Sequence, residues 1–249
     1  MFLNKLAIDK QSTVSDLVRS DYRTAEVFRK FEIEYCCGGR WPLETICMMK
    51  GLEVNDLIRQ LEDVTRTVQL PSIMAFQGWN LDFLIDYIIN VHHNYLKRAL
   101  PETEGLLNEF AEKHADKYKY LPELTTQLNK VNKKAESAMQ REEEIIFPYI
   151  RQITHAWQDK ESYAALLVRT LRKPLEEMMY KENETLPETI QVIRKLTDTY
   201  KPPEKACVSH HVVFSKLREL DEDLMQHIYL EKSVLFPRAV EIEKELLEN

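Results

Sequence analysis

The sequence predicts an all-α protein, and three observations support this prediction. Only five of the 249 residues are glycine, whereas 30% are charged. Long tracts rich in Glu, Lys and Leu place apolar residues at the spacing of helix faces. A motif that runs from His227 to Pro237 recurs in related form from Glu142 to Pro148, so two helices present equivalent faces. A chain of this length can bury a substantial core without disulfides.

Residues 1–65 are predicted to form a small helical module. Thr13 and Asp21 can each cap a short helix, because their side-chain oxygens can accept hydrogen bonds from the free N–H groups at a helix start. Gly51 is expected to end a third helix, since glycine readily adopts positive φ. A fourth helix is expected at about 53–65.

An adjacent cysteine pair, Cys36 and Cys37, interrupts this module and is followed by Gly38 and Gly39. The two glycines permit a tight turn. Arg40 and nearby backbone N–H groups would favour the thiolate form of an accessible cysteine. We therefore interpret the pair as functional thiols. Cysteine also behaves as a small buried hydrophobe, and composition alone leaves that alternative open.

The rest of the chain is predicted to be a linker followed by a four-helix bundle. Residues 66–79 lose apolar periodicity and contain Pro71 and Gly78, which is typical of a linker. Residues 80–249 carry four long apolar stripes, whose faces a bundle would bury together. The four helices are expected from Asn80 to about Pro101, Glu123 to Phe147, Tyr163 to Glu182 and Lys205 to Phe236, with a short charged helix at the end of the chain. Pro101 is expected either to kink or to end the first of them.

The repeated motif suggests a metal site inside this bundle. His227 and Glu231 are four residues apart, so they project from one helix face, one turn apart. In the other copy Glu142 takes the place of Glu231, but Ala138 stands where His227 would be. The two helices therefore offer equivalent carboxylates but only one imidazole.

Four candidate metal ligands would come from three helices: His93, Glu142, His227 and Glu231. A buried carboxylate without a partner is costly, and a cation removes that cost. Two imidazoles and two carboxylates suit iron, manganese or zinc. A single His on an apolar stripe is more often a core residue, and a single Glu is usually solvated. His92 follows the stripe as well as His93 does, so the pattern leaves the choice between them open.

Charge and hydropathy exclude several other classes of function. The net charge is −7, and basic residues alternate with acidic ones, so no nucleic-acid surface is expected. No apolar run approaches the length of a membrane span. Four cysteines are too few and too irregularly spaced for a disulfide framework, which favours the reducing cytoplasm.

The chain resembles the RIC/ScdA-type iron-sulfur cluster repair di-iron proteins over nearly its whole length. The similar segments are Ile33–Arg40, Leu84–His93, Glu142–Ile150, Pro202–Cys207 and Asp223–Arg238. The resemblance implies a cysteine-bearing ScdA-like module, then a hemerythrin-like up-down bundle with non-haem iron. It also implies residue roles. The iron ligands would be His93, Glu142, His227 and Glu231, and the family's cysteine pair would be Cys36 and Cys37.

Two histidines of the family's six-ligand centre are absent from this chain. Their positions are occupied by Ala138 and Glu182. Three outcomes stay open: Glu182 replaces an imidazole in a two-iron centre, one iron is held by the four remaining ligands, or the site is vestigial. We rank the one-iron centre first, because no nearby ligand fills the gap at Ala138. Near two irons per chain would indicate the first outcome, near one the second, and none the third.

The resemblance implies a stress protein that helps to repair iron-sulfur clusters damaged by nitric oxide or oxidants. Its partners would be damaged iron-sulfur proteins, and nitric oxide or O2 could bind at the iron. A hemerythrin-like sensor of O2 or nitric oxide and a metal-depleted structural protein are the alternatives. Whether the protein is an enzyme with turnover stays open. Accessible thiols on a small module are compatible with a homodimer.

Overall fold

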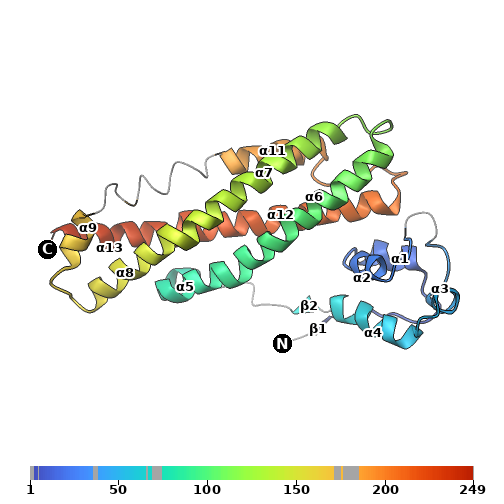
Figure 1. Cartoon of the computed structure of the whole chain (residues 1–249), viewed down its shortest axis with the longest axis horizontal. Helices are drawn as coiled ribbons and strands as arrows, with labels where there is room; N and C mark the ends of the chain where they lie inside the picture. Colours follow the sequence, from blue (N-terminus) through green and yellow to red (C-terminus); the bar gives the residue numbers. More distant parts are fainter. Residues whose placement is uncertain are drawn as a thin grey trace. The chain divides into compact units, whose positions relative to one another are not determined.

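The helices of the chain form two compact units, each described here by itself (Figure 1). The computed structural model describes residues 3–4, 6–35, 39–65, 67–68, 75–170, 175 and 185–248. One unit combines Met1–Met74 with Tyr200–Arg218, and the other combines Ala75–Thr199 with Glu219–Asn249. The predicted all-α class is confirmed, since the described residues contain only one strand pair, of two residues each.

The described part of the N-terminal unit before residue 75 contains four short helices and this strand pair. The helix caps follow the sequence: the Thr13 side chain accepts from the Asp16 N–H, and Gly51 ends α3 with φ 67°. Asp21 Oδ1 accepts from the Arg23 N–H at the start of α2. The elements are α1 (Val14–Ser20), α2 (Thr24–Lys30), α3 (Leu43–Lys50) and α4 (Val54–Thr65), with β1 (Leu3–Asn4) antiparallel to β2 (Thr67–Val68).

The core of the N-terminal unit includes residues from a distant part of the chain. Phe28, Leu43 and Leu61 are fully buried there, and Val208 and Val212 from the start of α12 pack with them. This grouping differs from the predicted division, which placed residues 80–249 in one bundle. The predicted boundaries at 65 and 80 remain a prediction.

Three long helices dominate the second unit, and each contains a π-helical turn. They run side by side in Figure 1. The first consists of α5 (Leu81–Tyr87), η2 (Ile88–His93) and α6 (Asn94–His114). The second consists of α7 (Leu121–Arg141), η3 (Glu142–Ile146) and α8 (Phe147–Gln158). The third consists of α12 (Val208–Leu230), of which Glu219 onwards belongs to this unit, η4 (Glu231–Leu235) and α13 (Phe236–Glu248). The shorter elements are η1 (Phe76–Gly78), α9 (Ala164–Arg169) and α11 (Thr185–Leu196).

One predicted helix end was wrong: the second helix continues through Pro148 to Gln158. Pro101, predicted to kink or end the first helix, lies inside α6 and does not end it, because the proline is exposed while Leu96, Leu100 and Leu107 continue the buried stripe past it. The predicted closing helix is α13, which continues directly from η4. Of the predicted third helix, Ala164–Arg169 is helical, and most of its remainder lies outside the described residues.

The bundle core is an apolar cluster shared by the three long helices. It is centred on Leu84 and Ile88 from the first helix, Phe147 and Ile150 from the second and Leu235 from the third. Burial of large aliphatic and aromatic side chains on this scale is the main stabilising contribution to such a bundle. The cluster fixes the inward faces on which the polar candidates lie. None of the described helices has the length and apolarity needed to cross a membrane.

Candidate metal centre

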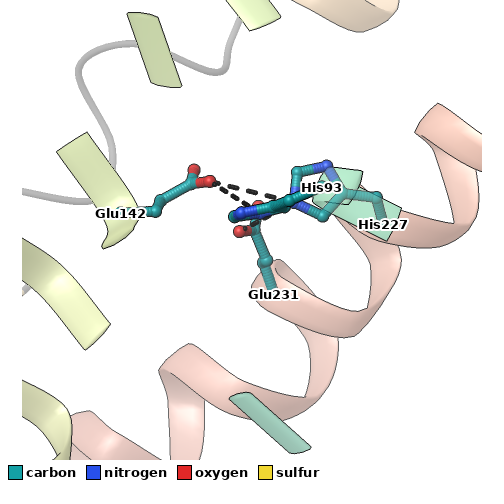
Figure 2. Close-up of side chains that lie close together, drawn as sticks. All are labelled: His93, Glu142, His227 and Glu231. Atoms are coloured by element: carbon teal, nitrogen blue, oxygen red, sulfur yellow. Dashed lines mark hydrogen bonds and ion pairs between the residues drawn. The ribbon is translucent and has the colours of Figure 1, made fainter. Parts of the chain in front are cut away.

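The structure brings four polar side chains together inside the bundle: His93, Glu142, His227 and Glu231. Each residue offers a ligand atom, and these atoms lie within 4.8 Å of one another. Their exposed fractions are 0%, 2%, 3% and 0%. Figure 2 shows the four side chains pointing toward a common point, His227 and Glu231 from one helix and His93 and Glu142 from two others. Among the described residues, this is the one His, Cys, Asp or Glu group with the geometry of a metal site.

The two imidazoles face each other through the same ring nitrogen. His93 Nε2 and His227 Nε2 are 3.0 Å apart. Glu142 Oε2 lies 3.4 Å from the first of these atoms, and Glu231 Oε1 lies 3.0 Å from the second. A neutral imidazole carries a proton on only one of its two ring nitrogens, and an ionised carboxylate carries none. The four side chains therefore bring many electron-pair donors together with few protons for hydrogen bonds between them.

Several atoms of the group lack the hydrogen bonds that buried polar atoms normally have. Among the described residues, Glu142 Oε2, both carboxylate oxygens of Glu231 and His227 Nδ1 have no hydrogen-bond partner. Unsatisfied buried acceptors are rare and costly. A cation at the common point would satisfy the three carboxylate oxygens. The donor set therefore fits a transition-metal ion such as iron.

The surrounding charges shift the pKa of each group. Burial, followed by the neighbouring Glu231 carboxylate, raises the pKa of Glu142 to about 7. Burial raises the pKa of Glu231 to about 7 as well. Burial lowers the pKa of His227 to about 4. For His93, burial lowers the pKa, but the neighbouring carboxylate of Glu142 and then that of Glu143 outweigh it, and the net direction is upward.

Each π-turn lies where its helix supplies a candidate ligand. The backbone N–H of Phe147 donates to the Glu142 carbonyl, five residues earlier, and the N–H of Phe236 donates to the Glu231 carbonyl in the same way. His93 ends the π-turn of the first helix. Such turns insert one extra residue into an α-helix and are frequent at functional sites. Each π-turn therefore changes the direction of its candidate ligand relative to the apolar face of the helical segment that follows it.

Sequence reasoning missed these π-turns, although the sequence contains a signal for two of them. Pro148 and Pro237 each follow a candidate ligand by six residues and lie inside continuous helices. Proline has no N–H to donate and disrupts the regular hydrogen-bond ladder, so the preceding turn must change its pattern. Phe147 from the same motif also stacks on the His93 ring, with ring centroids 5.6 Å apart.

The structure separates His93 from His92. Both are buried, but His92 Nδ1 lies 3.0 Å from Asp223 Oδ1 and is not part of the four-residue group. His155 Nε2 lies 2.6 Å from Asp82 Oδ2 and is not part of the group either. The π-turn that ends at His93 contributes to this difference, because it changes the direction of successive side chains.

The structure describes Ala138 and Cys47 but not the remaining predicted site residues. Ala138 is buried one turn before Glu142, and its methyl group offers no ligand. Glu182, Cys36 and Cys37 lie outside the described residues. Cys47 is buried as expected, and burial raises the pKa of its thiol.

Comparison with known proteins assigns the family. Residues 84–239 match the hemerythrin HHE cation-binding domain, and residues 10–65 match the ScdA_N domain, described as a domain of unknown function. The chain is 30% identical over 231 residues to the iron-sulfur cluster repair protein YtfE of Enterobacter sp. (strain 638), covering 93% of this chain and 97% of the relative. The chain belongs to the hemerythrin-type iron-sulfur cluster repair family. This membership confirms the resemblance inferred from the motifs.

Other relatives of this repair family show similar coverage. A probable iron-sulfur cluster repair protein of Haemophilus influenzae is 28% identical over 230 residues, which is 92% of this chain and 97% of the relative. The YtfE protein of Escherichia coli O1:K1 is 29% identical over 231 residues, which is 93% of this chain and 97% of the relative. The four-residue group lies within the segment that matches the hemerythrin domain.

The raised carboxylate pKa values predict that metal binding releases protons. At pH 6 Glu142 and Glu231, with pKa values of about 7, hold protons that a cation must displace. The apparent affinity should therefore fall below pH 7 by about tenfold per pH unit for each displaced proton. Calorimetric titration of Zn2+ in buffers of different ionisation enthalpy measures this release. Equal proton release at pH 6 and pH 8.5 would contradict the prediction.

Proposed function

We propose that this repair-family protein holds non-haem iron at His93, Glu142, His227 and Glu231 and assists the repair of damaged iron-sulfur clusters. The observation that carries the proposal is the buried four-residue group, in which Glu142 Oε2 and both oxygens of Glu231 lack hydrogen-bond partners among the described residues. Proteins of the same family that are named for cluster repair match nearly the whole chain. Damaged iron-sulfur proteins are accordingly its targets.

We propose further that the centre holds one iron per chain. Ala138 leaves one wall of the site without a ligand, and among the described residues no additional His, Cys, Asp or Glu joins the four. Iron bound there would supply a redox-active Lewis acid. The protein's own contribution would be to hold the imidazoles and carboxylates in place and to keep bulk water out of the bundle interior.

The cysteine pair gives the proposal its second part. Cys36 and Cys37 lie in the segment that matches the ScdA_N domain. We propose that their thiols act on the damaged cluster of a client protein in the reducing cytoplasm, where thiols persist. Under this proposal the iron binds nitric oxide or O2. The proposal is also compatible with a homodimer.

Repair of a nitrosylated iron-sulfur client by three forms of the protein tests this function. The wild type should restore client activity and contain about one iron per chain. His227→Ala should lose both iron and repair, since it removes one of the two imidazoles. Cys36→Ser combined with Cys37→Ser should abolish repair and leave iron content unchanged, because these residues lie outside the bundle segment that holds the four candidates.

Three outcomes would contradict parts of the proposal. Full repair by the double Cys→Ser variant would remove the thiol role. Iron binding by the wild type without any repair would favour a hemerythrin-like sensor of O2 or nitric oxide instead. Absence of iron after anaerobic loading would leave the bundle as a structural scaffold.

A further inference from the structure

Glu143, the residue after Glu142, makes a separate contact with the metal centre. Its Oε1 lies 2.7 Å from His93 Nδ1, while the opposite ring nitrogen, Nε2, faces the cluster. A carboxylate beside Nδ1 favours the tautomer that carries its proton on that nitrogen. The lone pair of His93 Nε2 is then directed at the position a metal would occupy.

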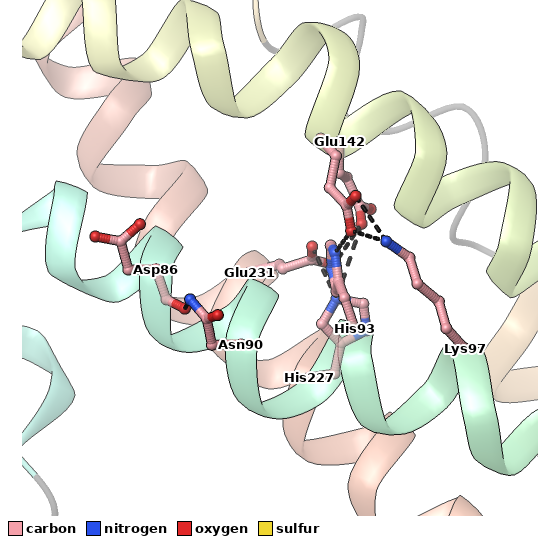
Figure 3. Close-up of polar contacts among 8 residues, drawn as sticks. Asp86, Asn90, His93, Lys97, Glu142, His227 and Glu231 are labelled. Carbon is pink, nitrogen blue, oxygen red and sulfur yellow. Dashed lines mark hydrogen bonds and ion pairs between the residues drawn. The ribbon is translucent and has the colours of Figure 1, made fainter.

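Lys97 holds this carboxylate in place. Its Nζ lies 2.7 Å from both oxygens of Glu143. Lys97 follows His93 by about one helical turn, and both side chains reach from the same helix toward the helix of Glu142 (Figure 3). The bidentate ion pair restricts the position of Glu143, and Glu143 in turn restricts rotation of the His93 ring.

The three residues form a chain of contacts from the surface to the buried centre. The Lys97 side chain is 47% exposed and that of Glu143 is 26% exposed, whereas His93 is fully buried. Lys97 and Glu143 line a surface pocket of about 550 Å³, together with Asn132, Met139 and Glu144 among others. The pair therefore lies between solvent and the imidazole.

We propose that Glu143, held by Lys97, is a positioning residue that orients His93 and tunes the metal it binds. This inference rests on the proposed iron centre. Metal-bound imidazoles commonly donate their other N–H to a carboxylate, which fixes the ring and strengthens it as a ligand. A stronger donor stabilises the ferric state more than the ferrous state, so Glu143 lowers the reduction potential of the iron.

Metal affinity of position-143 variants tests the proposal, with Glu144→Ala as the matched control. Both carboxylates line the same pocket on the same π-turn, but among the described residues Glu144 accepts its side-chain hydrogen bond from Gln140. Glu143→Ala should weaken Fe2+ binding by about 10–100-fold under anaerobic competition with a chelator. Glu143→Gln keeps an acceptor oxygen for the His93 N–H and should recover most of this loss. Glu144→Ala should stay within about twofold of the wild type.

A double-substitution cycle asks whether Lys97 acts through Glu143. Lys97→Met should weaken Fe2+ binding less than Glu143→Ala does. Adding it to Glu143→Ala should cause no further loss, because the residue it positions is already absent. The reduction potential of the bound iron should rise in Glu143→Ala, rise less in Glu143→Gln and stay unchanged in Glu144→Ala.

The outcomes separate this inference from the proposed function. If the wild type binds Fe2+ and Glu143→Ala binds it equally well, the positioning role is wrong and the iron centre stands. Equal losses of Fe2+ affinity in Glu143→Ala and Glu144→Ala would also overturn the role. The loss would then come from the reduced negative charge of the pocket and not from the contact with His93. If the wild type itself binds no Fe2+, Zn2+ or Co2+, the iron centre is wrong.

Discussion

Replacement of Glu231 by Leu is expected to abolish metal binding and to stabilise the metal-free protein. The side chain is fully buried, and within the described chain neither of its oxygens has a hydrogen-bond donor. The loss of one of four ligands removes the metal, while an apolar side chain of similar size suits the buried position. Such an opposition between function and stability is expected where a site is built for a ligand.

The size of this gain should depend on pH. Burial raises the pKa of Glu231 from 4.5 to about 7, so the folded state favours the protonated form. As the pH rises from about 4.5 to about 7, the folded protein is destabilised relative to the unfolded chain. One pKa unit corresponds to about 1.4 kcal/mol, so the free energy of unfolding should increase by about 3 kcal/mol in Glu231→Leu at pH 8. The gain should be small near pH 5.

Glu243→Leu is the matched control for this substitution. Glu243 is also buried in the bundle, but it accepts hydrogen bonds from the Tyr149 hydroxyl at 2.8 Å and from the Leu175 N–H at 3.3 Å. Its replacement leaves these donors unsatisfied and should lower the free energy of unfolding by about 1–3 kcal/mol without changing metal content. Urea unfolding of the metal-free proteins at both pH values measures the two effects. A less stable Glu231→Leu protein at pH 8 would contradict the expectation.

Deletion of Ile145 is expected to remove metal binding while the bundle still folds. This exposed residue lies inside the π-turn η3, which contains one residue more than an α-helical turn. The shortened segment can return to α-helix without changing the faces that α7 and α8 present to the core. The Phe147 N–H would still donate to the Glu142 carbonyl, now as a regular α-helical hydrogen bond, and loss of the widened turn should move the Glu142 carboxylate from its present position. Fe2+ affinity should fall by more than about tenfold.

Deletion of Lys130 provides the contrast. This exposed residue lies in regular helix α7, away from any π-turn. Its removal rotates the two halves of the helix relative to each other by about 100°, which turns either Leu124 and Leu128 or Ala135 and Met139 out of the core. Circular dichroism on heating should show a folded Ile145 deletion and a strongly destabilised Lys130 deletion. Similar unfolding temperatures for the two deletions would contradict the interpretation of η3 as a turn with one extra residue that the helix can lose.

The inward faces of the helices were predictable from the sequence because they depend on local chemistry. Thr13 and Gly51 mark helix ends through hydrogen bonding and φ preference, which need no tertiary information. The one-turn spacing of His227 and Glu231 places both on one face for the same reason. Pro101 shows the opposite case: packing of the flanking leucines outweighs the local cost of the proline, so the helix does not end there.

The sequence by itself determined an all-α chain, its capped helices and the residue types of a metal site. Only the tertiary structure decided that His93 and not His92 faces Glu142 and that π-turns direct the ligands. It also decided that Glu143 from the adjoining helix, held by Lys97, supports His93. The physical reason is that a period of 3.6 residues fixes directions within one helix. Distances between helices, and any change in that period, follow from the core that packs them together.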